Sequence, residues 1–123
     1  MIYLAIPIKH NNPEIEGARI ECANRIAALF HDRGIPVFSP ASHGGAFARH
    51  GSNGRGWDYW KKIDLPILTL CCSKMLIVKI PGWQESRGIQ VERAAAMEVG
   101  IPIVEIMPHY KFMPELIRQQ LAS

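Results

Sequence analysis

Four short apolar runs, separated by longer segments with helical patterning, most limit the fold of this 123-residue chain. They cover residues 2–8, 35–38, 75–80 and 101–106. Continuous apolar runs of this length are typical of parallel strands that are covered on both faces. Strands that alternate with helices favour right-handed crossovers into one sheet. We therefore expect an α/β three-layer sandwich with a flavodoxin-like parallel sheet of four to five strands.

Helix start and stop signals lie between these runs. Asn12 followed by Pro13 predicts a helix start, and Gly34 predicts the end of that helix. Gly100 predicts the end of a later helix, and Pro66 predicts a kink or an end within another. Four helices are expected, over residues 13–33, from residue 57 to or through Pro66, over 87–99 and over 114–121.

Residues 41–56 interrupt this alternation. The stretch SHGGAFARHGSNGRG contains five glycines and has no sustained periodicity. Glycine-rich segments without periodicity are typical of loops, and long loops in compact domains are often lids or binding loops. We therefore expect a long loop over residues 41–56.

Composition limits the class of protein. Apolar residues make up 48% of the chain and charged residues 20%, which suits one compact domain over residues 1–123. The net charge of +3 comes from scattered Lys and Arg residues, so we expect no polymeric nucleic-acid partner. No apolar stretch reaches the roughly 20 residues that a membrane span needs. Three cysteines, an odd number without zinc-ligand spacing, favour a reducing, cytoplasmic location and no metal site.

Glu92 is the most informative single residue. On a helix over residues 87–99, Gln90 and Arg93 lie on a polar arc, whereas Glu92 lies within the apolar face. A buried, unpaired carboxylate costs free energy and therefore needs a partner or a function. Two interpretations stay open: a structural carboxylate held by an arginine or by backbone amides, or a functional group at the crevice beyond the strand ends.

The segment PGWQESRG opens the same helix with small residues. Backbone amides near Gly82, Ser86 and Gly88 can hold an anion such as phosphate. The alternative is an ordinary turn in which Ser86 caps the helix. Trp83 can stack on a base or pack in the core. The same two alternatives apply to three aromatic residues: Trp57, Tyr59 and Trp60.

Three blocks of sequence together resemble the nucleoside 2-deoxyribosyltransferase-like superfamily. IYLAIPI at residues 2–8 is similar to the family's Tyr-Leu-Ala-Gly-Pro opening, and WDYWKKIDLPIL at 57–68 is similar to its Asp-containing helix before the third strand. GWQESRGIQVERAAAMEVGIPIV at 82–104 is similar to its Gly-x-x-x-Glu helix followed by a strand. The blocks occur in the family's order and spacing over most of the chain.

The resemblance implies a role for each matching residue. Glu92 falls on the nucleophile that attacks C1′ of a deoxyribosyl group, Asp64 on the acid that protonates the departing base, and Tyr3 on the tyrosine that orients the nucleophile. Ser86 falls on the position that binds the sugar 5′ end or its phosphate, and Lys9 lies near the basic residue that meets this phosphate. We expect Glu92 to be the ionised group and Asp64, in a less solvated setting, to be the proton donor.

Ile6 departs from the family pattern, because it stands where the family has a glycine that lets substrate approach. The family builds its active sites across subunit contacts, so the resemblance implies a homo-oligomer, a dimer or a tetramer. The apolar-rich segment 107–113 is a candidate contact for it. No metal and no organic cofactor is implied.

The sequence therefore predicts an N-glycoside hydrolase or transferase that acts on a (deoxy)nucleoside or its 5′-monophosphate through a Glu nucleophile. The alternative is a non-catalytic nucleotide-binding or sensing module on the same scaffold. A Rossmann-like phosphoribohydrolase fits less well, because its Pro-Gly-Gly-x-Gly-Thr phosphate loop is absent. The predicted substrate-binding residues are Ser86, Gly88, Lys9, Gly82, Trp83 and Ile6.

Overall fold

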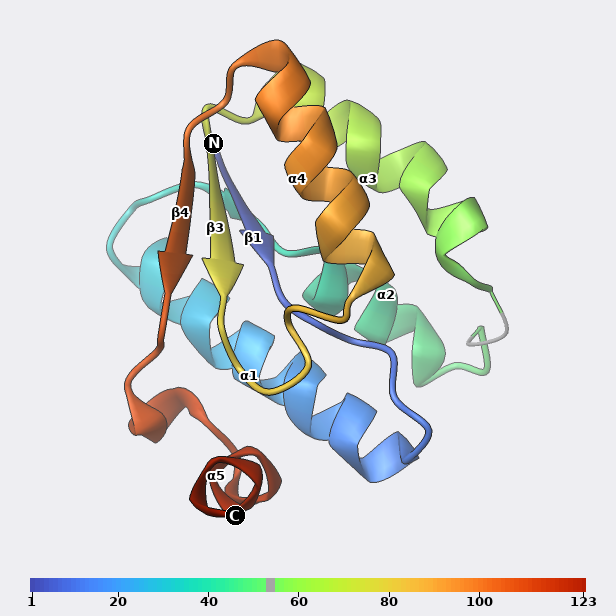
Figure 1. The fold of residues 1–123 in the computed structure, drawn as a ribbon, viewed down its shortest axis with the longest axis vertical. Coiled ribbons are helices and arrows are strands. Elements are labelled where there is room, and N and C mark those ends of the chain that lie inside the picture. The colour runs from blue at the N-terminus through green and yellow to red at the C-terminus, as the bar shows by residue number, and fades with distance from the viewer. Residues whose placement is uncertain (53–54) are drawn as a thin grey trace.

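A four-stranded parallel sheet forms the middle layer of the protein (Figure 1). The computed structural model describes residues 1–52 and 55–123. The strands are β1 (Ile2–Ala5), β2 (Val37–Phe38), β3 (Lys74–Val78) and β4 (Ile103–Ile106), in the order β2-β1-β3-β4. The helices are α1 (Pro13–Asp32), α2 (Pro40–Ala48), α3 (Trp57–Cys71), α4 (Arg87–Val99) and α5 (Glu115–Ala122), with a 3-10 turn, η1 (Tyr110–Phe112), before α5.

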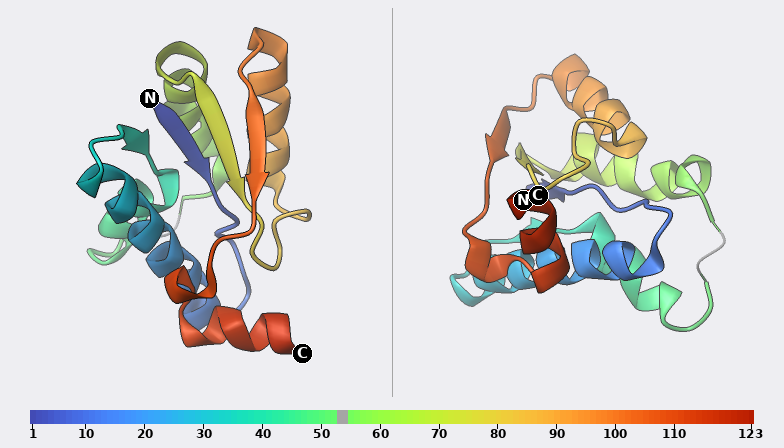
Figure 2. Two further views of the ribbon diagram at one scale, coloured as in Figure 1. Left: turned by 90° about the vertical axis from the view of Figure 1, so that its left-hand side faces the viewer. Right: turned by 60° about the horizontal axis from the view of Figure 1, so that its bottom comes forward.

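The two faces of the sheet carry two separate apolar cores. Figure 2 shows α1, α2 and α5 on one side of the sheet and α3 and α4 on the other. Because side chains alternate along a strand, Leu4 packs in the first core and Tyr3 and Ala5 in the second. We call these layers the α1/α5 face, with Leu4, Val78 and Ile117 in its core, and the α3/α4 face, with Tyr3 in its core. The predicted three-layer α/β fold with a flavodoxin-like parallel sheet is confirmed.

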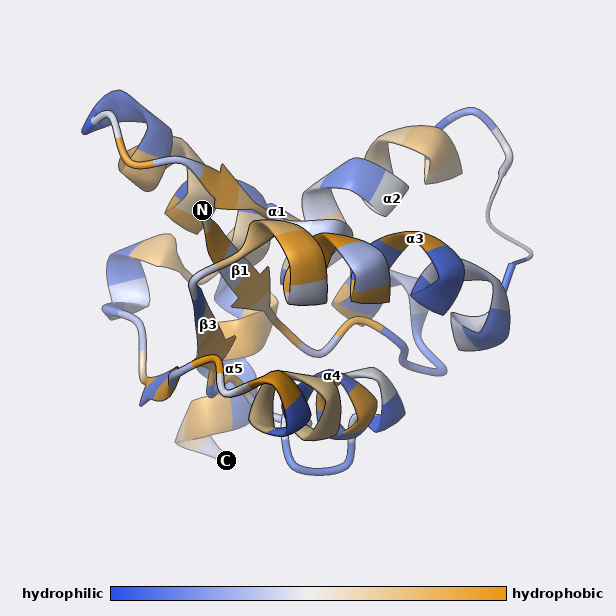
Figure 3. Ribbon diagram, turned by 90° about the horizontal axis from the view of Figure 1, so that it is seen from above, coloured by the Kyte–Doolittle hydropathy of each residue, from blue (hydrophilic) through white to orange (hydrophobic). Residues whose placement is uncertain are grey.

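Hydropathy follows this layering. In Figure 3 the strands β1 and β3 are largely hydrophobic, apart from Lys74 at the start of β3, and they lie between helices whose outer sides are more polar. Within residues 1–52 and 55–123, no helix is both long and apolar enough to cross a membrane.

The prediction of one long loop over residues 41–56 is wrong for its first half, which belongs to α2. Ser39 caps this helix by accepting a hydrogen bond from the Ser42 N–H at 3.2 Å, and Pro40 follows at the first helical position. A Cβ on Gly45 would lie 2.7 Å from Ile20 Cγ2, so this helical glycine allows α2 to approach α1 closely. Its glycines therefore indicated close packing rather than a loop. Residues 53 and 54 of the predicted loop lie outside the described residues.

Other helix and strand predictions differ only in their ends. Helix α4 has the predicted bounds, and Gly100 follows it at φ +78°, in the left-handed region that favours glycine. Helix α3 continues through Pro66 to Cys71, so the proline does not end it. Strand β1 ends at Ala5, before Pro7, which has no N–H to give to a neighbouring strand.

Candidate functional site

A cavity of about 860 Å³ opens beyond the carboxyl ends of β1 and β3. The loop after β1, helix α2, the first half of α3 and the loop that leads into α4 form its wall. This is the place where open parallel sheets bind ligands. Most of the predicted site residues line the cavity: Ile6, Lys9, Asp64, Gly82, Ser86, Gly88 and Glu92.

Glu92 is buried on α4, with 5% of its surface exposed, and it accepts a hydrogen bond from the Tyr3 hydroxyl. Strand β1 directs Tyr3 into the α3/α4 face, where the ring is fully buried. Burial raises the pKa of Glu92 to about 8; the Tyr3 hydrogen bond opposes this rise, and the charge of Asp64 adds to it. Burial, followed by the charges of the two carboxylates, also raises the pKa of Tyr3, so its hydroxyl stays a donor.

Asp64 is the second buried carboxyl group of the cavity. It lies on α3, with 4% of its surface exposed, and within the described residues its Oδ1 has no hydrogen-bond partner. Burial raises its pKa to about 6. The two carboxyl groups are almost equally buried, so the structure does not show the less solvated setting expected for Asp64, and the larger upward pKa shift falls on Glu92.

The raised pKa values of the two carboxyl groups differ. With one pKa near 6 and the other near 8, the pair holds about one proton at pH 7. Such a pair can supply one proton donor and one ionised carboxylate at the same pH. Across residues 1–52 and 55–123, no three His, Cys, Asp or Glu side chains gather in a way that could hold a metal ion.

Two tryptophans of α3 form an aromatic wall of the cavity, and sequence reasoning had left them between stacking and packing. Trp57 lies seven positions before Asp64 and Trp60 lies four positions before it, so all three side chains share one helix face. A Cβ on Gly88 would lie 3.6 Å from the Trp57 ring, and one on Gly44 would lie 3.7 Å from the Trp60 ring. Both glycines therefore let an indole pack directly on a helix backbone.

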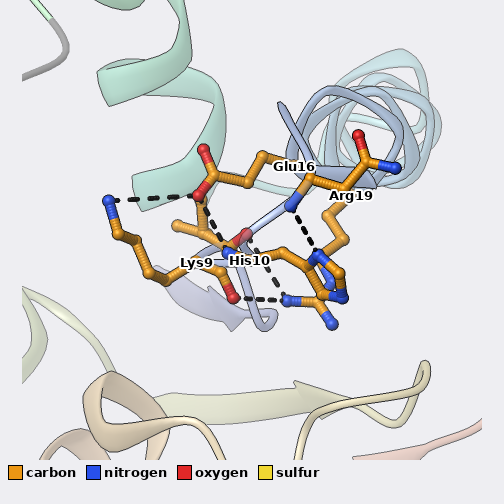
Figure 4. A network of polar contacts seen from close by, with 6 residues as sticks. Lys9, His10, Glu16 and Arg19 are labelled. Atoms are coloured by element: carbon orange, nitrogen blue, oxygen red, sulfur yellow. Dashed lines mark hydrogen bonds and ion pairs between the residues drawn. The ribbon is translucent and has the colours of Figure 1, made fainter. Parts of the chain in front are cut away.

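A polar network occupies the end of the cavity formed by the loop after β1 (Figure 4). The Lys9 side chain is 91% exposed, and its Nζ lies 4.0 Å from Glu16 Oε1. The same Glu16 oxygen accepts a hydrogen bond from the backbone N–H of His10 at 2.8 Å. Arg19 reaches the backbone carbonyl of Lys9 from α1. The network places Lys9 at the cavity mouth, with its ammonium group in solvent.

Ser86 caps helix α4, which is one of the two roles that the sequence left open for it. Its Oγ accepts a hydrogen bond from the Ile89 N–H at 3.2 Å and caps α4. Since this bond uses a lone pair, the hydroxyl proton can still be donated to a ligand in the cavity. Ile6 is 5% exposed and lines the cavity in place of the glycine expected from the resemblance.

Trp83 is the predicted binding residue that the structure does not bring to the cavity. It is absent from the described lining, and its ring packs against the core of the α3/α4 face. Lys79 Nζ lies 5.6 Å from the centre of this ring. The turn directs Trp83 away from the cavity, because Gly82 takes φ +98° just before it.

Arg19 is the site residue that sequence reasoning missed. It is 4% exposed, lines the cavity and comes from α1. Cys22, Ala23 and Ile26 follow it at helical spacing and are all buried. The reasoning that singled out Glu92, a charged residue within an apolar helix face, would also have identified Arg19.

Comparison with known proteins identifies a family without assigning an activity. Among curated proteins, none matches this sequence. A domain-family model does match residues 1–107, a range that includes the four strands and helices α1 to α4. The likeness to nucleoside 2-deoxyribosyltransferases therefore stays a prediction. The chain belongs to the family described as a domain of unknown function, DUF1937.

Proposed function

We propose that the protein cleaves the N-glycosidic bond of a deoxynucleoside or its 5′-monophosphate, with Glu92 as nucleophile and Asp64 as acid. The observation that carries this proposal is the pair of buried carboxyl groups in one cavity, which together hold about one proton at neutral pH. A structural carboxylate would be expected to pair with a cation or with backbone amides. Glu92 instead accepts from the Tyr3 hydroxyl, a neutral donor.

In the first step, a Glu92 oxygen bonds to C1′ as the bond from C1′ to the base nitrogen breaks. The base leaves with the bonding electrons and takes a proton from Asp64. The reaction needs a protonated Asp64 and an ionised Glu92. Binding of the substrate therefore has to favour transfer of the proton from Glu92 to Asp64. Positive charge that develops at C1′ favours the ionised form of Glu92, and the Tyr3 hydroxyl stabilises that form.

In the second step, water or a second base attacks C1′ and the bond to Glu92 breaks. Asp64, now ionised, takes the proton of the attacking group, which returns the pair to its starting state. Attack by water makes the protein a hydrolase, and attack by a base makes it a transferase. Trp57 and Trp60 offer aromatic faces on which a base can stack beside Asp64.

The sugar 5′ end belongs at the amino end of α4. Ser86 and the first backbone amides of this helix border the cavity there, and Lys9 lies at its mouth. Helix N-termini favour anions, so a 5′-phosphate suits this end of the cavity.

A nucleotide-binding module without turnover is the second candidate, and Ile6 favours it. This bulky buried side chain lines the cavity next to β1 and leaves less room in it than a glycine would. A pKa of about 8 also keeps Glu92 largely protonated until a ligand binds.

The test is the release of free base from a panel of deoxynucleosides and their 5′-monophosphates, measured by chromatography. Glu92→Gln should abolish release while ligand still binds, and Asp64→Asn should slow it by about 100- to 10,000-fold. Glu98→Gln, an exposed carboxylate on the same helix, is the matched control and should leave release unchanged.

Each result separates the two candidates. Release by the wild type that is lost in Glu92→Gln supports glycosidic cleavage. Binding of a nucleotide by calorimetry with no release from any substrate would reject catalysis in favour of the binding module. Release that persists in Glu92→Gln would exclude Glu92 as the nucleophile.

A further inference from the structure

Arg19 is a buried cation whose partners are backbone carbonyl groups. Its guanidinium donates from Nη1 to the Lys9 carbonyl at 2.8 Å and to the Ile8 carbonyl at 3.5 Å, and from Nη2 to the Pro81 carbonyl at 3.0 Å. Burial lowers the pKa of Arg19, while the charges of Glu16 and Glu85 oppose that effect. A charged donor makes stronger hydrogen bonds to carbonyl groups than a neutral one.

These carbonyls belong to two loops that are far apart in the sequence. Ile8 and Lys9 lie in the loop between β1 and α1, and Pro81 lies in the loop between β3 and α4. The strands that carry them, β1 and β3, are neighbours in the sheet. Arg19 therefore joins the two loops at the carboxyl edge of the sheet, where the cavity opens.

Gly82 has no side chain and so leaves room for the guanidinium of Arg19. It takes φ +98°, and a Cβ at this position would lie 2.4 Å from Arg19 Nη2. A side chain here would therefore meet both backbone strain and a clash with the guanidinium. The close approach of Gly82 to the guanidinium is thus a second contact between Arg19 and the loop after β3, besides the Pro81 carbonyl.

The two joined loops carry the groups proposed to meet the sugar 5′ end. Lys9 is in the first loop, and Ser86 ends the second loop and caps α4. Among the described atoms, Arg19 forms its hydrogen bonds with loop carbonyls and none with Glu92 or Asp64. Arg19 can therefore set the spacing of the binding groups without touching the reacting pair.

We propose that Arg19 is a positioning residue that ties the β1–α1 loop to the β3–α4 loop and thereby sets the distance between Lys9 and Ser86. The tie itself is a property of the free protein. Its effect on catalysis rests on the proposed function, in which Lys9 and Ser86 hold the sugar 5′ end or its phosphate.

The tie is tested by amide hydrogen exchange in the ligand-free protein. Arg19→Lys keeps the charge but loses the fork that reaches both loops, so exchange should speed up in residues 6–12 and in residues 81–86 together. Arg25→Lys is the matched control, because Arg25 lies on the same helix and pairs with Glu21 at 3.3 Å on the surface. Gly82→Ala disturbs the same contact from the opposite side and should loosen the same loops.

The kinetics of base release by Arg19→Lys test the effect of the tie on catalysis. Loss of hydrogen bonds to a charged group should raise KM by about 10- to 100-fold. The value of kcat should change less than KM, and the pH optimum should not move, because the carboxyl pair is untouched. A merely structural role would instead lower the amount of folded protein and leave KM unchanged in the folded fraction.

The outcomes are distinct. Faster exchange in both loops with a raised KM supports the tie. Faster exchange in one loop alone, or in neither, overturns it, and so does a fall in kcat at constant KM. If Arg19→Lys does not fold, exchange in Gly82→Ala decides in the same way. If the wild type releases no base, the proposed function fails, while hydrogen exchange still decides whether Arg19 joins the loops.

Discussion

The two faces of the sheet differ in what they bury. The α1/α5 face has a core of apolar side chains, including Leu4, Val78 and Ile117, and its buried cation Arg19 is hydrogen-bonded to backbone carbonyl groups. Beside its own apolar core, the α3/α4 face buries the Tyr3 hydroxyl and two carboxyl groups, Asp64 and Glu92. Burial of apolar surface stabilises the first face, whereas desolvated carboxyl groups destabilise the second. The comparison indicates that the α3/α4 face loses stability through the carboxyl groups that it buries, and three measurements can test this contrast.

The largest effect on stability is expected on the α1/α5 face. Leu4 is fully buried, so Leu4→Ala leaves a cavity in a closely packed core and should cost about 2–5 kcal/mol of unfolding free energy. Urea denaturation measures this loss. Leu70→Ala, at a leucine that is 82% exposed, is the control and should change stability little. A similar cost for both variants would contradict the assignment of this core.

A smaller, pH-dependent effect is expected on the α3/α4 face. The pKa of Glu92 is raised from 4.5 to about 8, so the folded state holds this proton more tightly than the unfolded state. The stabilisation from this proton is full below about pH 4.5 and is lost as pH rises through about 8. Glu92→Gln should remove this loss and be more stable than the wild type at pH 8 by about 1 kcal/mol or more.

Urea denaturation at several pH values measures the slope. Glu98→Gln, exposed on the same helix, should keep the slope of the wild type. Equal slopes in the wild type and Glu92→Gln would show that the unfolded and folded states hold this proton alike, and the contrast between the faces would then disappear.

The smallest effect concerns the Tyr3 hydroxyl. Base release by the wild type should peak between about pH 6 and pH 8, where the carboxyl pair holds one proton. The Tyr3 hydrogen bond lowers the pKa of Glu92, so Tyr3→Phe should raise that pKa and move the optimum to higher pH by about one unit.

A pH–rate profile measures this shift. Tyr59→Phe removes a hydroxyl from a ring that is 40% exposed and is the control. An optimum that stays in place in Tyr3→Phe would mean that the hydroxyl does not tune the pair.

Most of the fold could be predicted because each signal was local. Apolar runs indicated the strands, and Gly100 marked the end of α4 because a left-handed residue has to follow the helix. Helix α2 was missed although Ser39 and Pro40 mark its start, because its glycines suggested a loop. Its glycines face Ile20 of α1 and Trp60 of α3, and such long-range packing leaves no mark in the local pattern.

The candidate site was predictable where a charge interrupted an apolar pattern. Glu92 was found in this way, and Arg19 gives the same signal within α1. Sequence position locates the turn that holds Trp83 but not the direction of its side chain, which packs against the core of the α3/α4 face. The similar burial of Asp64 and Glu92 depends on the packing of α3 against α4, which spacing along the chain does not determine.

Helix α5 lies beyond the segment that the family model matches, but it contributes to the core of the fold. The family match ends at residue 107, yet Met113 and Ile117 beyond it are almost fully buried in the core of the α1/α5 face. Gln120 of the same helix also lines the cavity. A fragment cut at the family boundary would therefore expose part of its own interior to water, and relatives with another ending have to close this face with other residues. Comparisons of such relatives should include the residues that cover the α1/α5 face as well as the matched segment.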